Sequence, residues 1–257
     1  MQGSLSGKVA LVAGSSYGIG RAVAVKLAQN GADIIVNGRH EEKALEVVQQ
    51  IKGIGRKAIF EKADVTDYPQ VKQMVANSIQ KLGKIDILVA SGGRPAKVAG
   101  LQFFRETDPE EYISYAQSQW FSRLHCVRGV LDHMVERQSG KIVMITTDAG
   151  RWPTPGECLS GGAAAALVIA TKVLAREFAR WKIRINTICL TVTRDTPDLE
   201  TMLASPIARI GKKALERQPF PTTSNDIAEA ALFLASGASD QITGQILSVN
   251  GGLSFPG

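Results

Sequence analysis

The sequence predicts a doubly wound α/β fold, in which helices cover both faces of a parallel β-sheet of about seven strands. Short runs rich in β-branched residues alternate along the chain with longer runs of helical period. This alternation is typical of parallel strands joined by right-handed crossover helices. The 257 residues are 44% hydrophobic and 21% charged, and no Pro/Ser-rich linker or low-complexity tract divides them. We therefore expect residues 1–257 to form a single domain.

Each expected strand is a short β-branched run, and most are followed by a stretch of helical period. Strands are expected at Val9–Ala13, Asp33–Asn37, Ala58–Lys62, Ile85–Ala90, Ile142–Thr146, Ile183–Ile188 and Ile246–Val249. Helices are expected at Ile19–Gln29, Glu42–Ile51, Pro69–Leu82, Glu111–Glu136, Leu159–Arg180 and Asn225–Ala235. The stretch from Thr191 to Pro221, rich in Pro, Thr and charge, has no clear strand. We expect it to be either a lid over a ligand crevice or a plain surface excursion.

The charge balance favours small anionic ligands over nucleic acid. Lys and Arg outnumber Asp and Glu by 30 to 24, which attracts anions such as nucleotides or acyl-CoA esters. The positive charges are mixed with acids, as in Arg39-His40-Glu41-Glu42-Lys43, and form no basic block. We therefore expect solvated helix faces and no nucleic-acid partner.

The cysteines and the N-terminal segment indicate a reducing, aqueous compartment. Cys126, Cys158 and Cys189 have neither metal-ligand spacing nor an even number, so we expect three free thiols and no metal site. The N-terminal residues lack the layout of a signal peptide, and the longest apolar run, Ala163–Ala170, is too short to cross a bilayer. These features predict a soluble, cytoplasmic protein without a membrane anchor.

A glycine-rich turn follows the first expected strand. Gly14, Gly18 and Gly20 are spaced G-x-x-x-G-x-G in "AGSSYGIG", directly before an amphipathic helix. Glycine allows a tight turn and a close backbone approach, and the helix start offers free amides and a positive dipole end to a pyrophosphate. The strand, turn and helix context makes this a nucleotide-binding motif, with Ser16 and Ile19 as further expected contacts.

From this turn onward the chain resembles the short-chain dehydrogenase/reductase family, whose members have a single Rossmann-type domain. The likeness continues through "KADVTD", "GKIDILVASGG", "GKIVMITTDAG", "WKIRINTICL" and "ITGQILSVNGGLS", and so covers nearly the whole chain. The resemblance implies that NAD or NADP binds here and that Asp64 and Val65 contact the adenine. At the end of the second strand the sequence offers Asn37, Gly38 and Arg39 without a carboxylate. That pattern is similar to NADP-using members, although Arg39 is equally well interpreted as a solvated side chain.

The same resemblance implies a catalytic set of Asn, Ser, Tyr and Lys, most of which this chain lacks. The corresponding positions are Gln119, Thr147, Ser160 and Ala164, of which only Thr147 keeps a hydroxyl in a plausible role. A Ser hydroxyl is far too weak an acid to replace a phenol. Around the nicotinamide, the family's Asn-Asn-Ala-Gly reads Ala90-Ser91-Gly92-Gly93 and its Pro-Gly reads Leu190-Thr191. We therefore expect no catalytic residue at the usual positions.

The helix that carries Ser160 and Ala164 is better suited to packing than to chemistry. Ser160 is a favoured N-cap residue, and the glycines and alanines after it allow close helix approach. In the family, this helix and the one at Glu111–Glu136 resemble halves of a four-helix bundle between two subunits, and we assign Tyr112 and Tyr115 to packing or interface roles.

These features predict a pseudoenzyme subunit that assembles with an active paralogue in a dimer or tetramer, as in the two-subunit hydroxyacyl-CoA dehydrogenases that it resembles. Two alternatives stay open. One is a divergent NAD(P)H-dependent reductase that uses side chains such as Glu157 or Asp148. The other is a nucleotide-binding regulatory protein without a catalytic partner.

Overall fold

The expected seven-stranded parallel sheet is present. The computed structural model describes residues 3–93 and 100–256. Neighbouring strands pair in parallel in the order β3-β2-β1-β4-β5-β6-β7. The strands are β1 (Val9–Ala13), β2 (Asp33–Gly38), β3 (Ala58–Lys62), β4 (Ile87–Ala90), β5 (Gly140–Thr147), β6 (Ile183–Leu190) and β7 (Ile246–Val249).

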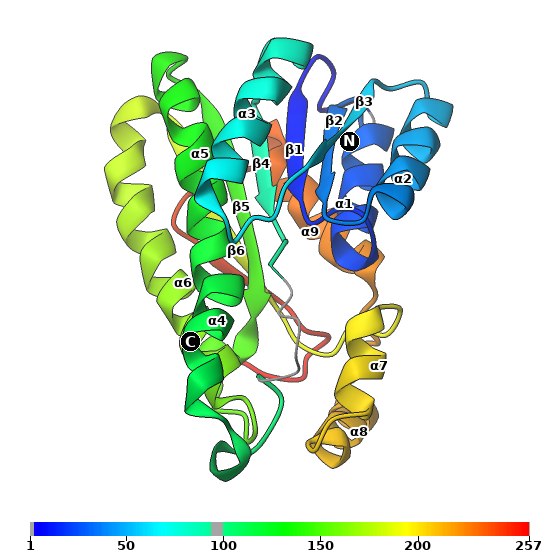
Figure 1. The fold of residues 1–257 in the computed structure, drawn as a ribbon, viewed down its shortest axis with the longest axis vertical. Coiled ribbons are helices and arrows are strands. Elements are labelled where there is room, and N and C mark those ends of the chain that lie inside the picture. The colour runs from blue at the N-terminus through cyan, green and yellow to red at the C-terminus, as the bar shows by residue number, and fades with distance from the viewer. Residues whose placement is uncertain (1–2, 94–99, 257) are drawn as a thin grey trace.

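Helices cover both faces of this sheet (Figure 1). On one face α1, α2 and α9 bury their apolar sides, and on the other α3, α5 and α6 do so. The helices are α1 (Gly18–Gln29), α2 (Glu41–Gly53), α3 (Tyr68–Leu82), α4 (Tyr112–Ala116), α5 (Ser122–Glu136), α6 (Cys158–Phe178), α7 (Pro197–Leu203), α8 (Ala208–Arg217) and α9 (Ser224–Ala235). The chain is therefore a Rossmann-type doubly wound domain.

The central strands are apolar because both of their faces are buried. In β1, Val12 packs into the layer under α1 and α9, whereas its neighbour Leu11 packs into the layer under α3 and α5, and both are 0% exposed. Alternate residues of a strand point to opposite faces of the sheet. A strand that is covered on both faces therefore buries every side chain, which favours apolar residues at all positions. This explains why β1 and β4 read as unbroken apolar runs.

The helix expected at Glu111–Glu136 is interrupted. Between α4 and α5 the backbone forms a π-helical turn over Gln117–Phe121. The carbonyl of Ser118 accepts hydrogen bonds from the Ser122 hydroxyl at 2.6 Å and from Arg123 Nη1 at 2.7 Å. Such turns occur frequently at functional sites.

The segment from Thr191 to Pro221 contains two helices, α7 and α8, that the sequence did not reveal. Both lie beyond the carboxyl ends of the strands, in yellow and orange at the lower right of Figure 1. Residues of both helices line a cavity described below, which agrees with the lid interpretation of this segment.

Helix α6 begins earlier than expected, and one prediction about it was wrong. Its N-cap residue is Glu157, so Ser160 lies inside the first turn and does not cap the helix. The stretch Cys158–Trp181 is long and apolar enough to cross a membrane by those two measures. In this fold Leu167 and Phe178 hold it against the sheet at 0% and 2% exposure, whereas Ile169 and Val173 on its outer face are 61% and 51% exposed.

Candidate functional site

A crevice lies at the carboxyl ends of the strands, where the strand order reverses between β1 and β4. This is the position at which doubly wound sheets bind ligands. A cavity of about 230 Å³ occupies it. All eight residues expected to contact a nucleotide line this cavity, namely Gly14, Ser16, Gly18, Ile19, Gly20, Arg39, Asp64 and Val65.

The glycine turn packs too closely for side chains. A Cβ at Gly14, whose φ is +71°, would lie 2.4 Å from the Cα of Gly92, and a Cβ at Gly20 would lie 2.2 Å from the Gly14 carbonyl oxygen. Glycine at these two positions therefore lets the β1 turn, the loop after β4 and helix α1 come together.

The start of α1 is suited to an anion. Among the described residues no side chain caps this helix, and its first turn contains no acid. By contrast, Thr223 and Asp226 form a capping box at α9, and α2 has Glu41 and Glu42 in its first turn. The first amides of α1 and its positive dipole end therefore face the crevice without a competing carboxylate.

At the end of β2, Asn37 and Arg39 have different roles. Asn37 is 1% exposed, accepts from the Gly14 amide at 3.1 Å and donates to the carbonyls of Glu61 and Ala63. It therefore fastens the glycine turn to the neighbouring strand. Arg39 is half-exposed and lies 3.6 Å from the Asp64 carboxylate across the outer end of the crevice.

The Asp64 carboxylate is held in its charged form. Burial opposes this, but hydrogen bonds from the Thr66 amide and hydroxyl, together with the Arg39 charge, leave the pKa of Asp64 below its ordinary value.

Three of the four positions of the expected catalytic set line the crevice. Gln119, Thr147 and Ser160 line the crevice, but Ala164 is 1% exposed and lines neither cavity. Gln119 donates from Nε2 to the Gly93 carbonyl at 2.7 Å, and the Thr147 hydroxyl accepts from the Ala149 amide at 3.2 Å. Both side chains therefore also hold loops in place.

Tyr115 on α4 brings a phenol to this place, whereas the sequence analysis assigned it only to packing or an interface. The phenol lies within hydrogen-bonding reach of the Ser160 hydroxyl, and the ring packs against Ala163. Ser160 in turn donates to the Glu157 carboxylate at 3.1 Å. Burial raises the pKa of Tyr115 to about 12, and the nearby Glu157 charge adds to the effect. The phenol is therefore a weaker acid than free tyrosine, the opposite of what a general acid near neutral pH requires.

Arg123 on α5 is the second residue that sequence reasoning missed. It is 7% exposed and lines both the nucleotide crevice and a second, larger cavity. Its guanidinium comes from the helix opposite Ala164. Ser160 and Ala164 lack a phenol and an ammonium group. That lack was a signal in the sequence to look for a phenol and a cation in the helical segment that contains Tyr115 and Arg123.

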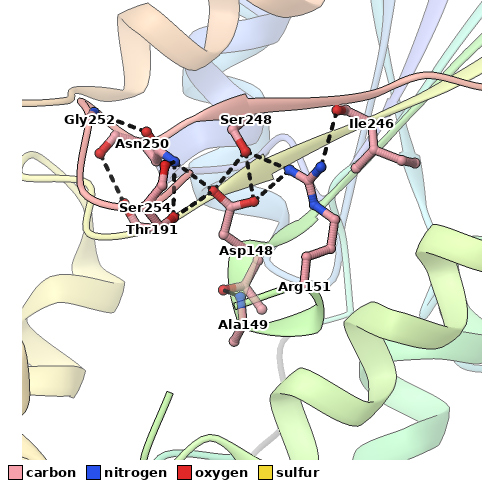
Figure 2. A network of polar contacts seen from close by, with 10 residues as sticks. Asp148, Ala149, Arg151, Thr191, Ile246, Ser248, Asn250, Gly252 and Ser254 are labelled. Atoms are coloured by element: carbon pink, nitrogen blue, oxygen red, sulfur yellow. Dashed lines mark hydrogen bonds and ion pairs between the residues drawn. The ribbon is translucent and has the colours of Figure 1, made fainter. Parts of the chain in front are cut away.

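Asp148, one of the two acids considered for a divergent reaction, accepts hydrogen bonds that hold the structure together. Its carboxylate accepts from Arg151 Nη2 at 2.8 Å, the Ser248 hydroxyl at 2.8 Å, Asn250 Nδ2 at 2.8 Å and the Ser254 hydroxyl at 3.4 Å. Figure 2 shows how these donors surround the carboxylate and join the turn after β5 to the C-terminal segment. At 1% exposure, Asp148 is positioned to hold this segment rather than to exchange protons with a ligand.

The comparison with known protein families agrees with this geometry. The family model for short chain dehydrogenases matches residues 8–204. The chain belongs to the short-chain dehydrogenase/reductase family. Among its relatives, the 3-oxoacyl-[acyl-carrier-protein] reductase FabG of Chlamydia pneumoniae is 29% identical over 98% of this chain and 99% of its own length. FabG of Thermotoga maritima is 30% identical over 97% of this chain and 98% of its own length.

Solved structures of short-chain dehydrogenases superpose closely. Carveol dehydrogenase from Mycobacterium avium in complex with NAD gives a TM-score of 0.88 at 25% identity, covering 98% of this chain and 99% of that one. A 7α-hydroxysteroid dehydrogenase complexed with NADH and 7-oxoglycochenodeoxycholic acid gives 0.88 at 30% identity, covering 96% and 94%. The dehydrogenase fold is thus retained across almost the whole chain.

The crevice of this chain fits a dinucleotide on its phosphate side. The close approach at Gly14 and the uncapped start of α1 leave backbone amides for a pyrophosphate. On the nicotinamide side, Leu190 contributes to the lining beside Thr147 and Ser160. Nucleotide binding and proton transfer therefore depend on different parts of the crevice.

Proposed function

We propose that this chain is a noncatalytic subunit that assembles with an active paralogue of the same family, as part of an NAD(P)-dependent hydroxyacyl-CoA or alcohol dehydrogenase. One observation carries the proposal: Ser160 and Ala164 stand where a phenol and an ammonium group are needed, and Ala164 does not reach the crevice. The arrangement resembles 2-(hydroxyphenylmethyl)succinyl-CoA dehydrogenase, in which both chains have this fold. We expect the protein to be soluble and cytoplasmic.

The cofactor of this family accepts or supplies a hydride, and the residues that would hold it here are those of the phosphate and adenine side. The amides at the start of α1 would hold the pyrophosphate, Asp64 and Val65 would contact the adenine, and Arg39, which lines the same crevice, would bind near the ribose. What is lost is the acid that protonates the substrate oxygen. A missing general acid alone lowers the rate by roughly 10²–10⁴-fold.

The outer face of α6 supports a partner. Ile169 and Val173 are one turn apart and largely exposed. On the neighbouring helical segment, Ile113 and Phe121 are 74% and 36% exposed. Apolar side chains grouped in this way on two adjacent helices are typical of a helix-bundle interface.

The test compares the lone chain with the chain produced together with a dehydrogenase paralogue encoded beside it. We expect a mixed oligomer by light scattering, and nucleotide-linked turnover only when the paralogue is present. Ile169→Glu should break the mixed oligomer, whereas Leu45→Glu, at an exposed position on α2, should not. Full turnover by the lone chain would refute the proposal.

A divergent active reductase is the second candidate, and the FabG relatives favour it. In that case the lone chain oxidises NADPH with a carbonyl substrate, and Tyr115→Phe or Glu157→Gln abolishes the activity. A regulatory nucleotide-binding protein would instead bind NAD(P) and leave the turnover of every dehydrogenase tested unchanged.

A further inference from the structure

A second cavity of about 720 Å³ adjoins the nucleotide crevice. Its wall is largely apolar, with Trp152 from the loop after β5, Leu190 from β6, and Met202, Ile207 and Ile210 from the lid segment. This volume lies within the range of roughly 300–1,000 Å³ that is typical of small-molecule sites. The cavity can therefore enclose an apolar body larger than a few carbon atoms.

The charges around this cavity are unequal. Among the described lining residues, the cations are Arg123, Lys213 and Arg217, and the acids are Asp148 and Glu157. Asp148 is neutralised by Arg151 and its other donors. Glu157 is then the one remaining acid of the described lining, against three cations. The remaining field of the lining is positive and favours an anion.

The three cations lie at different depths. Arg123 is 7% exposed, whereas Lys213 and Arg217 are exposed on α8 of the lid. A buried guanidinium attracts a carboxylate where water competes poorly, and Arg123 keeps its charge while its Nη1 donates to the Ser118 carbonyl at 2.7 Å. Cations at the mouth act mainly by attracting an anion during its approach.

The Tyr115 hydroxyl supplies a second donor at the deep end. Tyr115 and Arg123 belong to one continuous helical segment and both line the cavity. Because burial keeps the phenol protonated, it donates a hydrogen bond and does not compete for a proton. The deep end therefore combines a fixed cation with a neutral donor, which is an arrangement for binding an anion without reaction.

We propose that the larger cavity binds an apolar molecule with a single carboxylate, whose carboxylate lies at Arg123 and the Tyr115 hydroxyl and whose apolar part lies under α7 and α8. The proposal rests on the proposed function in one respect, since the bound molecule is not turned over.

The test measures binding to the lone chain, without nucleotide, by calorimetry and by the shift in melting temperature. The probes are 4-phenylbutyrate and decanoate, each compared with its uncharged amide. We expect each acid to bind at least about 10-fold more tightly than its amide, because only the acid pairs with the buried guanidinium. Equal affinity of acid and amide would overturn the proposal.

Variants locate the site. Tyr115→Phe keeps the ring and should weaken acid binding by about 2- to 10-fold, the usual worth of one hydrogen bond. Arg123→Met should abolish the preference for the acid. Because Arg123 also bonds to the Ser118 carbonyl, Arg123→Lys is the second variant, which keeps the charge and should reduce the preference.

The paired change Lys213→Gln and Arg217→Gln should slow association at low salt. Lys52→Gln, which removes an exposed charge on α2 away from both cavities, should change nothing. Unaltered acid binding in both Tyr115→Phe and Arg123→Lys would place the ligand elsewhere and refute the site.

The two proposals fail in different ways. Turnover of a ketone or alcohol by the lone chain refutes the noncatalytic role, whatever the ratio of acid to amide affinity. A ratio near one refutes the carboxylate site, whatever the turnover.

Discussion

The Tyr115 phenol on α4 lies within hydrogen-bonding reach of the Ser160 hydroxyl on α6. This phenol comes from helix α4, and it is a weaker acid than free tyrosine. Burial raises its pKa to about 12, whereas a general acid acts best when its pKa lies near the operating pH. A buried phenol with a raised pKa is therefore poorly suited to donate a proton near neutral pH.

Restoring the family's two residues should not restore turnover. In Ser160→Tyr with Ala164→Lys, the new phenol meets Tyr115, and the new lysine starts from a position that is 1% exposed and lines neither cavity. We expect activity at the background level in an NADPH oxidation assay with folding confirmed by circular dichroism. Substantial recovery would show that the nicotinamide side is intact.

Asp148→Ala should destabilise the protein strongly. It leaves Arg151, whose side chain is 13% exposed, without its buried carboxylate, and such a loss costs about 3–5 kcal/mol. For a protein of this size, the melting temperature should fall by roughly 10 °C. Asp240→Ala removes a carboxylate that is 57% exposed and should cost no more than about 1 kcal/mol. Similar melting temperatures for the two variants would contradict the role assigned to Asp148.

Glu157 should make stability depend on pH. Because burial raises its folded-state pKa, its contribution to stability is present in full below the unfolded pKa of about 4.3 and is lost as the pH rises through the folded-state value. Glu157→Gln cannot ionise, so its free energy of unfolding relative to the native protein should increase as the pH is raised from about 4 to 8. The exposed Glu216→Gln serves as the control. A difference that stays constant with pH would show that Glu157 titrates normally.

Arg39 should set the preference for the nucleotide. A guanidinium beside the ribose binds a 2′-phosphate through charge-assisted hydrogen bonds, which contribute about 1.5–3 kcal/mol. Arg39→Ala should therefore weaken NADP binding by about 10-fold or more and leave NAD binding nearly unchanged, as measured by calorimetry. An equal loss for both nucleotides would indicate that Arg39 acts only through its ion pair with Asp64.

The parts of the structure that depend on local pattern were predictable. Strands β1, β3 and β7 begin and end where the sequence predicts, because a short run rich in strand-forming residues marks each of them. The glycine turn was predictable for the same reason, since its spacing and its strand and helix neighbours are adjacent in sequence.

The missed features depend on contacts between distant segments. The π-helical turn at Gln117–Phe121 contains neither Pro nor Gly, so the sequence gives no sign of it. Tyr115 and Arg123 face α6 only after the sheet has brought α4, α5 and α6 together. Helices α7 and α8 are 7 and 10 residues long, too short to be stable without the cavity wall against which they pack.

The bonds around Asp148 make the wall of the larger cavity from two pieces of chain that are about a hundred residues apart. A fragment that ends before β7 contains Asp148 but none of its donors from Ser248, Asn250 or Ser254. Two fragments divided within the lid segment would each be incomplete. A carboxylic acid ligand bound in the cavity would contact both fragments and favour their reassociation. The chain is therefore a natural starting point for a split reporter of small organic acids.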